Sequence, residues 1–129
     1  MTSAGPCPCG SGASFGDCCE PIHHDHRRAD TAEALMRSRY TAYVTGAVDH
    51  LARSWHPGTR PSTIATDPQR AWQSLEVIAT ERGRALDAGG VVEFVATSTI
   101  DGQEHRLHER SRFERVAGAW VYVDGDLLP

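Results

Sequence analysis

The sequence contains no lysine and no asparagine, so all 13 of its basic residues are arginine. Without lysine, no side chain can form a Schiff base with pyridoxal phosphate or with a carbonyl substrate. A Walker-type phosphate loop and a lysine general base are excluded for the same reason. The chemistry of the chain must therefore depend on arginine, histidine, cysteine and carboxylate side chains.

Long apolar runs are also missing, since the longest unbroken one is the stretch Ala119–Val123. A membrane-spanning helix needs about 20 consecutive apolar residues, so we expect no membrane segment. Residues 1–10 lack the basic cluster and the apolar stretch of a secretory signal. The sequence therefore predicts a cytoplasmic protein, in a compartment where thiols stay reduced.

The length and charge of the chain set further limits. With 129 residues and 40% hydrophobic side chains, the chain is long enough to bury a real core. Seventeen acidic residues give a formal net charge of −4. Nucleic-acid binding depends on a basic electrostatic field, so the acidic balance argues against a nucleic-acid partner.

The four cysteines lie close together in the pattern Cys-x-Cys-x8-Cys-Cys, at Cys7, Cys9, Cys18 and Cys19. Four thiolates satisfy a tetrahedral zinc ion. The alternative is disulfides or free thiols, but adjacent cysteines bond to each other only with strain. The spacing therefore predicts one Zn²⁺ ion, held structurally because four protein ligands leave no position for a substrate.

A histidine run follows this cluster, at His23, His24 and His26. One of these side chains could replace Cys19 as the fourth ligand, because imidazole also binds zinc. The interpretation we favour is a solvated connector. This stretch closes a segment, residues 1–28, that is too poor in aliphatic side chains to build its own core.

Residues 29–129 have the pattern of a compact α+β domain. Asp30 and Glu33 have the spacing of a capping box, which predicts a helix that ends at Gly46. A second short helix is predicted over about Val48–Trp55, where Pro57 ends it.

Beyond this point the hydrophobic period changes to two, which indicates strands. The candidate strands are 75–86, 91–100, 104–116 and 119–124. Asp101-Gly102 and Ala117-Gly118 are signals for two-residue hairpin turns. These turns fix a register that pairs Phe94 with Glu109, Val92 with Ser111, Phe113 with Tyr122, and Ser111 with Asp124. One face of the sheet then carries most of the aromatic side chains, together with Glu109, Ser111 and Asp124.

Several motifs resemble known families. Cys7-Pro8-Cys9-Gly10-Ser11-Gly12 with Cys18-Cys19 resembles the SEC-C zinc motif found at the C-terminus of the secretion motor SecA. The stretches 35–43 (LMRSRYTAY), 55–57 (WHP), 108–113 (HERSRF) and 120–125 (WVYVDG) resemble the YchJ family. The resemblance implies a zinc motif at 1–28 and a nuclear-transport-factor-2-like domain at 29–129.

That domain type is a cystatin-like cone, in which a curved antiparallel sheet wraps around helices. The family is uncharacterised, so the resemblance implies an architecture and no activity. One departure concerns Ala13–Asp17, which contains no basic residue. In the SecA-type module a basic loop there is implicated in binding partners, so the resemblance does not carry that role over.

The cone should enclose a polar site. Arg39 falls near the apolar side of the first helix, and Glu109 on the facing sheet is its expected partner. His56 is expected at the rim, either as an acid or base or as a cap on the helix end. His108 is expected on the outer face. The candidate catalytic residues are Arg39, His56, Glu109, Ser111 and Asp124.

Two functions are consistent with this pattern. The first is a small zinc-stabilised binding protein whose cone holds a small molecule or a protein partner. The second is an isomerase- or dehydratase-type enzyme that uses the Arg/His/Glu cluster, which fold analogy supports only weakly. Cone domains often form homodimers through the outer sheet face, here Val91, Val95, Val121 and Val123 among charged side chains.

Overall fold

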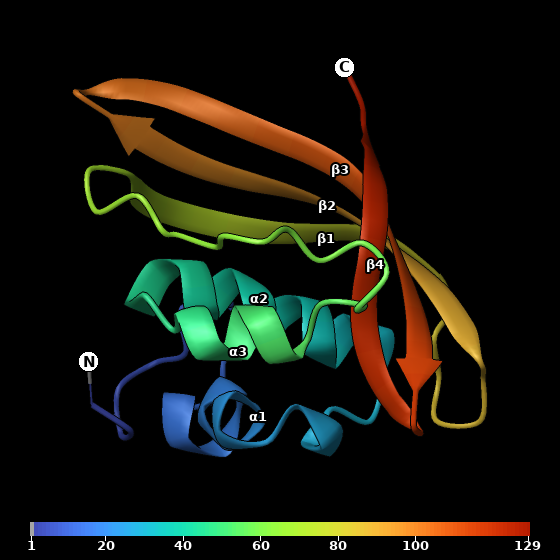
Figure 1. The fold of residues 1–129 in the computed structure, drawn as a ribbon. Helices are drawn as coiled ribbons and strands as arrows, with labels where there is room; N and C mark the ends of the chain where they lie inside the picture. Colours follow the sequence, from blue (N-terminus) through green and yellow to red (C-terminus); the bar gives the residue numbers. More distant parts are fainter. Residues whose placement is uncertain (1) are drawn as a thin grey trace.

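The computed structural model describes residues 2–129, which form a four-stranded antiparallel sheet and a set of helices (Figure 1). The N-terminal elements are two 3-10 turns and one helix: η1 (Phe15–Asp17), α1 (Cys19–His24) and η2 (His26–Arg28). The longer helices are α2 (Ala32–Thr45) and α3 (Val48–Arg53). The strands are β1 (Ala71–Arg82), β2 (Gly89–Ile100), β3 (Gln103–Val116) and β4 (Ala119–Leu127), paired in the order β1-β2-β3-β4.

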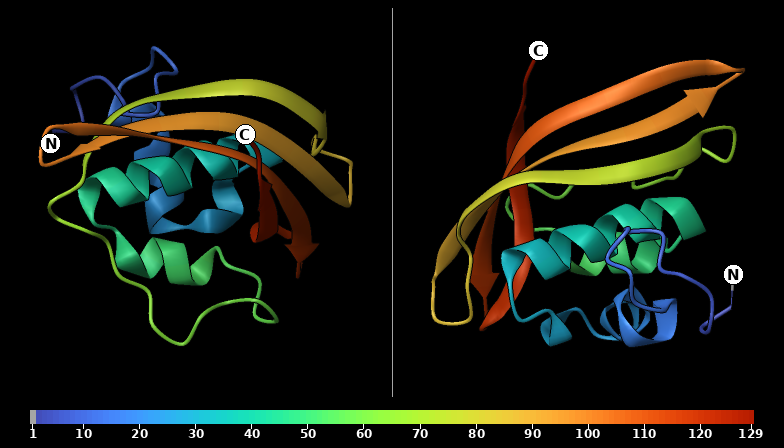
Figure 2. Two further views of the ribbon diagram at one scale, coloured as in Figure 1. Left: turned by 90° about the horizontal axis from the view of Figure 1, so that it is seen from above. Right: turned by 180° about the vertical axis from the view of Figure 1, so that it is seen from behind.

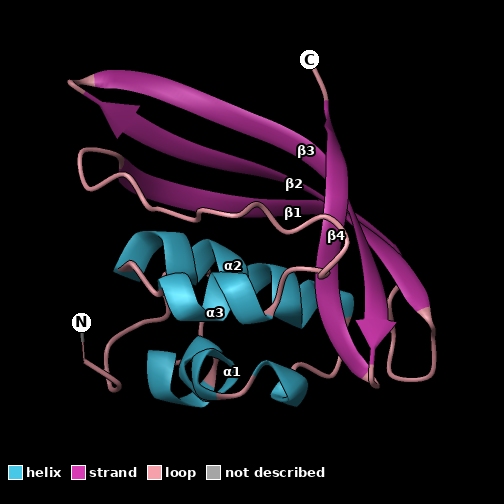
Figure 3. Ribbon diagram, viewed as in Figure 1, coloured by secondary structure: helices cyan, strands magenta, loops and turns pink. Residues whose placement is uncertain are grey.

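These elements form layers. The sheet arches over α2, α3 lies beside α2, and α1 lies on the side of α2 away from the sheet (Figures 1 and 2). All the strands curve in one sense, and β4 runs down beside the helices (Figure 3). The α+β class and the curved antiparallel sheet over helices are therefore confirmed.

Helix α2 starts one residue later than its capping signal predicts. The Thr31 hydroxyl, and not the Asp30 carboxylate, accepts the hydrogen bond of the Ala34 backbone N–H at 3.0 Å. Glu33 instead accepts from Arg37, one turn further along. The predicted end at Gly46 is confirmed, because this residue has the left-handed conformation (φ 78°) that glycine adopts without strain.

Strand β1 lies four residues earlier than the predicted strand 75–86. It ends before Gly83, where φ is 73°, and the chain then turns so that Leu86 is fully exposed. The backbones of Gly83 and Gly90 approach each other so closely that a Cβ atom on either would collide with neighbouring atoms. The alternating hydrophobic pattern of the sequence runs past Arg82 and so does not mark the end of the strand. The backbone conformation at Gly83 marks it.

The β2–β3 hairpin has the predicted register, with Ile100 opposite Gln103 and Phe94 opposite Glu109. The β3–β4 hairpin starts as predicted, with Phe113 opposite Tyr122, but a β-bulge at Val123 then shifts the pairing. Asp124 therefore pairs with Arg112 and not with Ser111. Because a one-residue shift moves a side chain to the other face, the predicted inward position of Asp124 is wrong.

One hydrophobic cluster runs through the layers. It joins Cys7, Cys9 and Cys19 to side chains of α2 and to the sheet as far as Trp120. Leu35 and Trp120 are fully buried within it. Among residues 2–129, no helix is both long enough and apolar enough to cross a bilayer.

Candidate functional site

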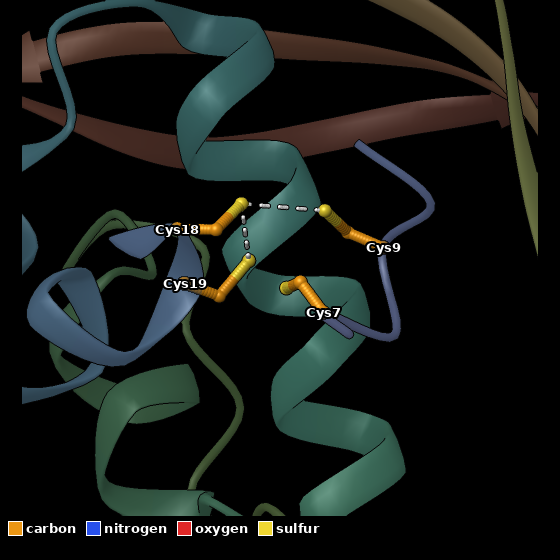
Figure 4. Close-up of side chains that lie close together, drawn as sticks. All are labelled: Cys7, Cys9, Cys18 and Cys19. Atoms are coloured by element: carbon orange, nitrogen blue, oxygen red, sulfur yellow. Dashed lines mark hydrogen bonds between the residues drawn. The ribbon is translucent and has the colours of Figure 1, made fainter. Parts of the chain in front are cut away.

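The four cysteine sulfur atoms converge on one point (Figure 4). All four Sγ atoms lie within 4.8 Å of one another, with 3.6 Å between Cys9 and Cys18 and 3.9 Å between Cys18 and Cys19. A tetrahedral ion with Zn–S bonds of about 2.3 Å requires sulfur atoms about 3.8 Å apart. The cysteines are all free thiols and three are buried, so the donors already have the spacing of a four-sulfur metal site.

The local backbone places these sulfur atoms. The backbone N–H of Cys7 donates to Ala13 O, and this hydrogen bond closes the loop that contains Cys9. Gly10 allows the tight turn, because its φ of 78° is unfavourable for other residues. The Ser14 hydroxyl caps the η1 turn at Asp17, and α1 then begins at Cys19.

Helix α2 supports the cluster from behind. Arg37 donates from Nη1 to Cys9 O at 2.7 Å, and Thr41, one turn later, donates its hydroxyl to Cys19 Sγ at 3.4 Å. The Ser11 hydroxyl lies 3.2 Å from Cys18 Sγ. Hydrogen bonds of this kind orient metal ligands and affect metal affinity. Sequence reasoning missed Arg37 and Thr41, whose four-residue spacing puts both on one face of α2.

The electrostatics of the cluster favour a cation. The pKa of the Cys9 thiol is lowered, chiefly by the neighbouring Cys19 side chain, and the pKa of Cys19 is raised by the same interaction. Burial raises the pKa of Cys18 to about 11. One negative charge is therefore easily held here, and the further thiolates need a positive ion among them. The residues present fit a metal ion.

The histidine run lies outside the cluster. His23 Nε2 is 2.7 Å from Ser38 O, and the side chain of His24 is exposed. The group of metal-ligating side chains in the described chain contains Cys19 and no histidine. This arrangement favours Cys19 over a histidine as the fourth ligand.

A cavity of about 360 Å³ lies on the other side of α2, between this helix and the concave face of the sheet. Its walls are mostly apolar. Apart from the tyrosine hydroxyls, the charged and hydroxyl groups in the walls come from four side chains: Arg39, Arg70, Glu109 and Ser111. Three of the five predicted pocket residues are therefore brought together. Arg70 was not predicted, because the proline-rich stretch before it has the pattern of a loop.

Arg39 is buried but does not form the predicted ion pair with Glu109. Its guanidinium lies against two neighbouring aromatic rings, 4.6 Å from the centroid of Trp55 and 4.8 Å from that of Tyr122. Nη1 donates to Leu51 O at 3.0 Å and to the Ser54 hydroxyl at 2.7 Å. Burial lowers the pKa of Arg39 to about 10, so the side chain stays charged at neutral pH.

Glu109 has other partners. Its Oε2 accepts hydrogen bonds from the Ser111 hydroxyl at 2.5 Å and from the Tyr122 hydroxyl at 3.0 Å. A Cβ atom at Gly125, on the neighbouring strand, would collide with this carboxylate. Burial raises the pKa of Tyr122, so its hydroxyl remains a donor to Glu109.

His56 and Asp124 do not line the cavity. The backbone N–H of His56 donates to Tyr122 O, and its ring lies 3.8 Å from the Glu114 carboxylate. Asp124 accepts from Arg112 at 2.6 Å on the outer side of the sheet. The predicted constellation is therefore incomplete, since His56 and Asp124 are held by outward-facing partners.

A Gly-x-Ser-x-Gly spacing, which can mark a nucleophilic serine, occurs at Gly12–Gly16 and was missed in the sequence. A nucleophile elbow of this kind requires a strand, a sharp turn and a helix. Here Ser14 accepts the Asp17 N–H at 3.2 Å within the cysteine loop. Its hydroxyl is a cap, and the spacing does not indicate a nucleophile.

Comparison with known proteins agrees with this arrangement. The chain matches the profile of the YchJ middle NTF2-like domain over residues 31–125 and that of the SEC-C motif over residues 6–21. The chain belongs to the YchJ family. A UPF0225 protein of Streptomyces coelicolor is 50% identical over 123 residues, which cover 95% of this chain and 96% of that protein.

Two solved structures share the fold. The solution structure of a SEC-C motif containing protein from Rhodopseudomonas palustris has a TM-score of 0.82 and 32% identity, over 95% of this chain and 98% of that one. A crystal structure of a SEC-C motif containing protein from Psychrobacter arcticus has a TM-score of 0.76 and 25% identity, over 98% of this chain and 85% of that one. The YchJ-family cone thus has experimental counterparts.

The YchJ-family chain also contains a buried neutral histidine. The Ser38 hydroxyl donates its one proton to Leu35 O, so His50 Nε2, 2.8 Å away, must donate to Ser38 Oγ. His50 Nδ1 is then a bare lone pair, buried and without a hydrogen-bond partner among residues 2–129. Protonating it would bury a charge with no acceptor, so burial lowers the pKa of His50 to about 3.

This histidine predicts a loss of stability in acid. Its pKa is about 3 in the folded chain and about 6.5 when unfolded. The unfolded chain therefore binds the extra proton as the pH falls below about 6.5. The free energy of unfolding should drop by about 2 kcal/mol between pH 7.5 and 5.0 on this account. Urea denaturation of the wild type and of His50→Gln, which keeps a donor for Ser38, measures the difference.

In His50→Gln, the free energy of unfolding should fall by about 2 kcal/mol less over this pH range than it does in the wild type. Metal content must be followed at each pH, because acid also protonates the cysteines. If the free energy of unfolding changes equally with pH in the two proteins, the assignment of a neutral His50 is wrong.

Proposed function

We propose that this YchJ-family protein is a zinc-stabilised binding protein whose cone holds a small molecule. The observation that carries the proposal is the cavity of about 360 Å³ between α2 and the sheet, a size within the range of ligand pockets. Its apolar wall with a few converging polar groups is also typical of such pockets. The four-cysteine cluster stands on the opposite side of α2 and supports the same helix.

Zinc is the metal that the donor set favours. Four sulfur donors at tetrahedral spacing suit Zn²⁺, which prefers thiolate and imidazole ligands. A site with four protein ligands is closed, so its proposed role is structural. Free thiols at this spacing also fit a reducing compartment, and we therefore place the protein in the cytoplasm.

An enzyme of the isomerase type is the second candidate. The observation in its favour is the Glu109 carboxylate in the cavity, close to the Ser111 and Tyr122 hydroxyls. The predicted acid–base partner His56 is absent from the cavity wall. The geometry therefore supports binding better than catalysis, and the net charge of −4 argues against nucleic acid as the bound partner.

A cavity-filling variant tests the binding proposal. Ala96 lies on β2, is buried and lines the cavity. The variant Ala96→Phe should occupy the space that a ligand needs. In an NMR screen of small organic fragments, compounds that shift the resonances of cavity residues should bind at least about tenfold more weakly to this variant.

The exposed Ala79 on β1 provides the matched control, Ala79→Phe, which should bind like the wild type. Zinc content and the dispersion of the NMR spectrum report whether each variant is folded. If no fragment shifts the cavity resonances of the wild type, or if the filled variant binds equally well, the proposed function is wrong.

A further inference from the structure

The aromatic wall of the cavity indicates the body of the ligand. Seven rings line it: Tyr40, Tyr43, Trp55, Trp72, Phe94, Phe113 and Tyr122. Several are fixed against one another, such as Trp55 against Tyr122 with centroids 5.2 Å apart and Tyr40 against Trp72 at 5.7 Å. Rigid flat walls of this kind favour a flat apolar group, because it gains contact at little cost in conformational entropy.

The positive charge of Arg39 indicates the polar end. The side chain is only 6% exposed, and its hydrogen bonds within residues 2–129 go from Nη1 to two neutral oxygens. In that part of the chain no carboxylate forms an ion pair with it. Burial lowers the pKa of Arg39 and Glu109 raises it through space, but no carboxylate among residues 2–129 contacts the guanidinium, so the site can pair with an anion supplied from outside.

The one carboxylate in the wall is occupied elsewhere. Glu109 accepts hydrogen bonds from the hydroxyls of Ser111 and Tyr122, and the Arg39 guanidinium lies over the ring of Tyr122. A second cation, Arg70, lines the same cavity, where it donates to the Ser98 hydroxyl at 2.7 Å. Two arginines against one glutamate leave the wall with a net positive charge.

We infer that the cavity takes a small organic carboxylate with a flat apolar body, whose anionic group lies against Arg39. This inference rests on the proposed function and adds the chemical class of the ligand. A planar guanidinium fixed by Leu51 O and the Ser54 hydroxyl matches the planar carboxylate in geometry. The rings hold the apolar body, and neither feature would recognise a strongly hydrated inorganic ion as well.

Titration with 2-naphthoate, and with its neutral isostere 2-naphthamide, tests this class by NMR. The full-length, metal-loaded protein should bind the carboxylate at least about tenfold more tightly than the amide, because a hydrogen bond between two charged groups is stronger than one to a neutral amide. The preference should fall below about twofold in Arg39→Met and persist in part in Arg39→Lys. The exposed Arg28 gives the matched control, Arg28→Met, which should keep the full preference.

The outcomes separate the two proposals. Equal binding of both compounds, with shifts at the cavity rings, would overturn the carboxylate inference and leave the binding function intact. Shifts of the Arg39 Nε–H resonance in the wild type on adding naphthoate alone would support it even if Arg39→Met fails to fold. Inorganic phosphate that binds as tightly as naphthoate would overturn the requirement for an apolar body. If neither aromatic compound shifts the cavity resonances, the inference is overturned, and the fragment screen with Ala96→Phe then decides the proposed function separately.

Discussion

Replacing Cys9 with serine is expected to abolish stoichiometric metal binding and to lower the free energy of unfolding by more than about 3 kcal/mol. Zinc binding to small folded sites is worth roughly 10–16 kcal/mol, much of which appears as folding energy. A serine hydroxyl stays protonated and cannot replace the thiolate. Cys9 is fully buried, and its carbonyl holds Arg37 of α2, so the loss should reach beyond the loop. Elemental analysis and urea denaturation measure the two effects.

The exposed Asp17 in the same loop supplies the control for this prediction. The variant Asp17→Asn removes a charge without touching a sulfur ligand, and it should keep its metal and its stability within about 0.5 kcal/mol. A Cys9→Ser protein that retains one metal ion per chain would show that Cys9 is not a ligand.

Trp120→Ala is expected to destabilise the protein by about 3–5 kcal/mol, the usual cost of removing a fully buried large aromatic side chain. Trp120 is 0% exposed, and the guanidinium of Arg115 lies over its ring, 4.3 Å from the ring centroid. Its indole N–H donates to Asp30 O, which ties β4 to the start of α2. The midpoint of urea denaturation should fall accordingly.

Leu86→Ala is the comparison for this variant, because Leu86 is fully exposed and should contribute within about 0.5 kcal/mol. A Trp120→Ala protein with a loss below about 1 kcal/mol would mean that β4 is not packed as described.

The β2–β3 hairpin shows what the sequence could predict. Asp101-Gly102 specifies a two-residue turn, and a turn of known length fixes the register of every pair along the strands. The pairing of Phe94 with Glu109 followed directly. The convergence of the four cysteines could also be predicted, because cysteines so close in sequence can meet at one point without any knowledge of the tertiary fold.

Other features depend on contacts between distant residues. The bulge at Val123 moves Asp124 outward, where Arg112 binds both it and Asp126. The carboxylate of Glu109 fills the space beside Gly125, an arrangement that no local pattern contains. Charge alone suggested Glu109 as the partner of Arg39. In the structure, the Arg39 guanidinium instead contacts two aromatic rings and two neutral oxygens. This arrangement depends on how Trp55 is placed beside Tyr122.

That placement comes from backbone pairing. The segment after α3 pairs with β4, since Ser54 O accepts the Tyr122 N–H and Tyr122 O accepts the His56 N–H. The pairing brings Trp55 and Tyr122 together beside Arg39 and leaves His56 outside the cavity. Pro57 in the sequence indicated where the helix ends, but not which strand the following residues would meet.

Helix α2 connects the two candidate sites of this YchJ-family protein. One of its faces presents Arg37 and Thr41 to the cysteine cluster, and another presents Arg39 and Tyr43 to the cavity. A metal ion that fixes the N-terminal segment against the first face would also hold the second in place. The proposed function therefore depends first on whether the cysteines hold zinc.

The most direct measurement is the zinc content of protein purified under reducing conditions without a metal-binding tag, combined with thiol alkylation. We expect one zinc ion per chain and four cysteines that resist alkylation until a chelator removes the metal. A well-folded protein that contains no metal and whose thiols react at once would contradict it.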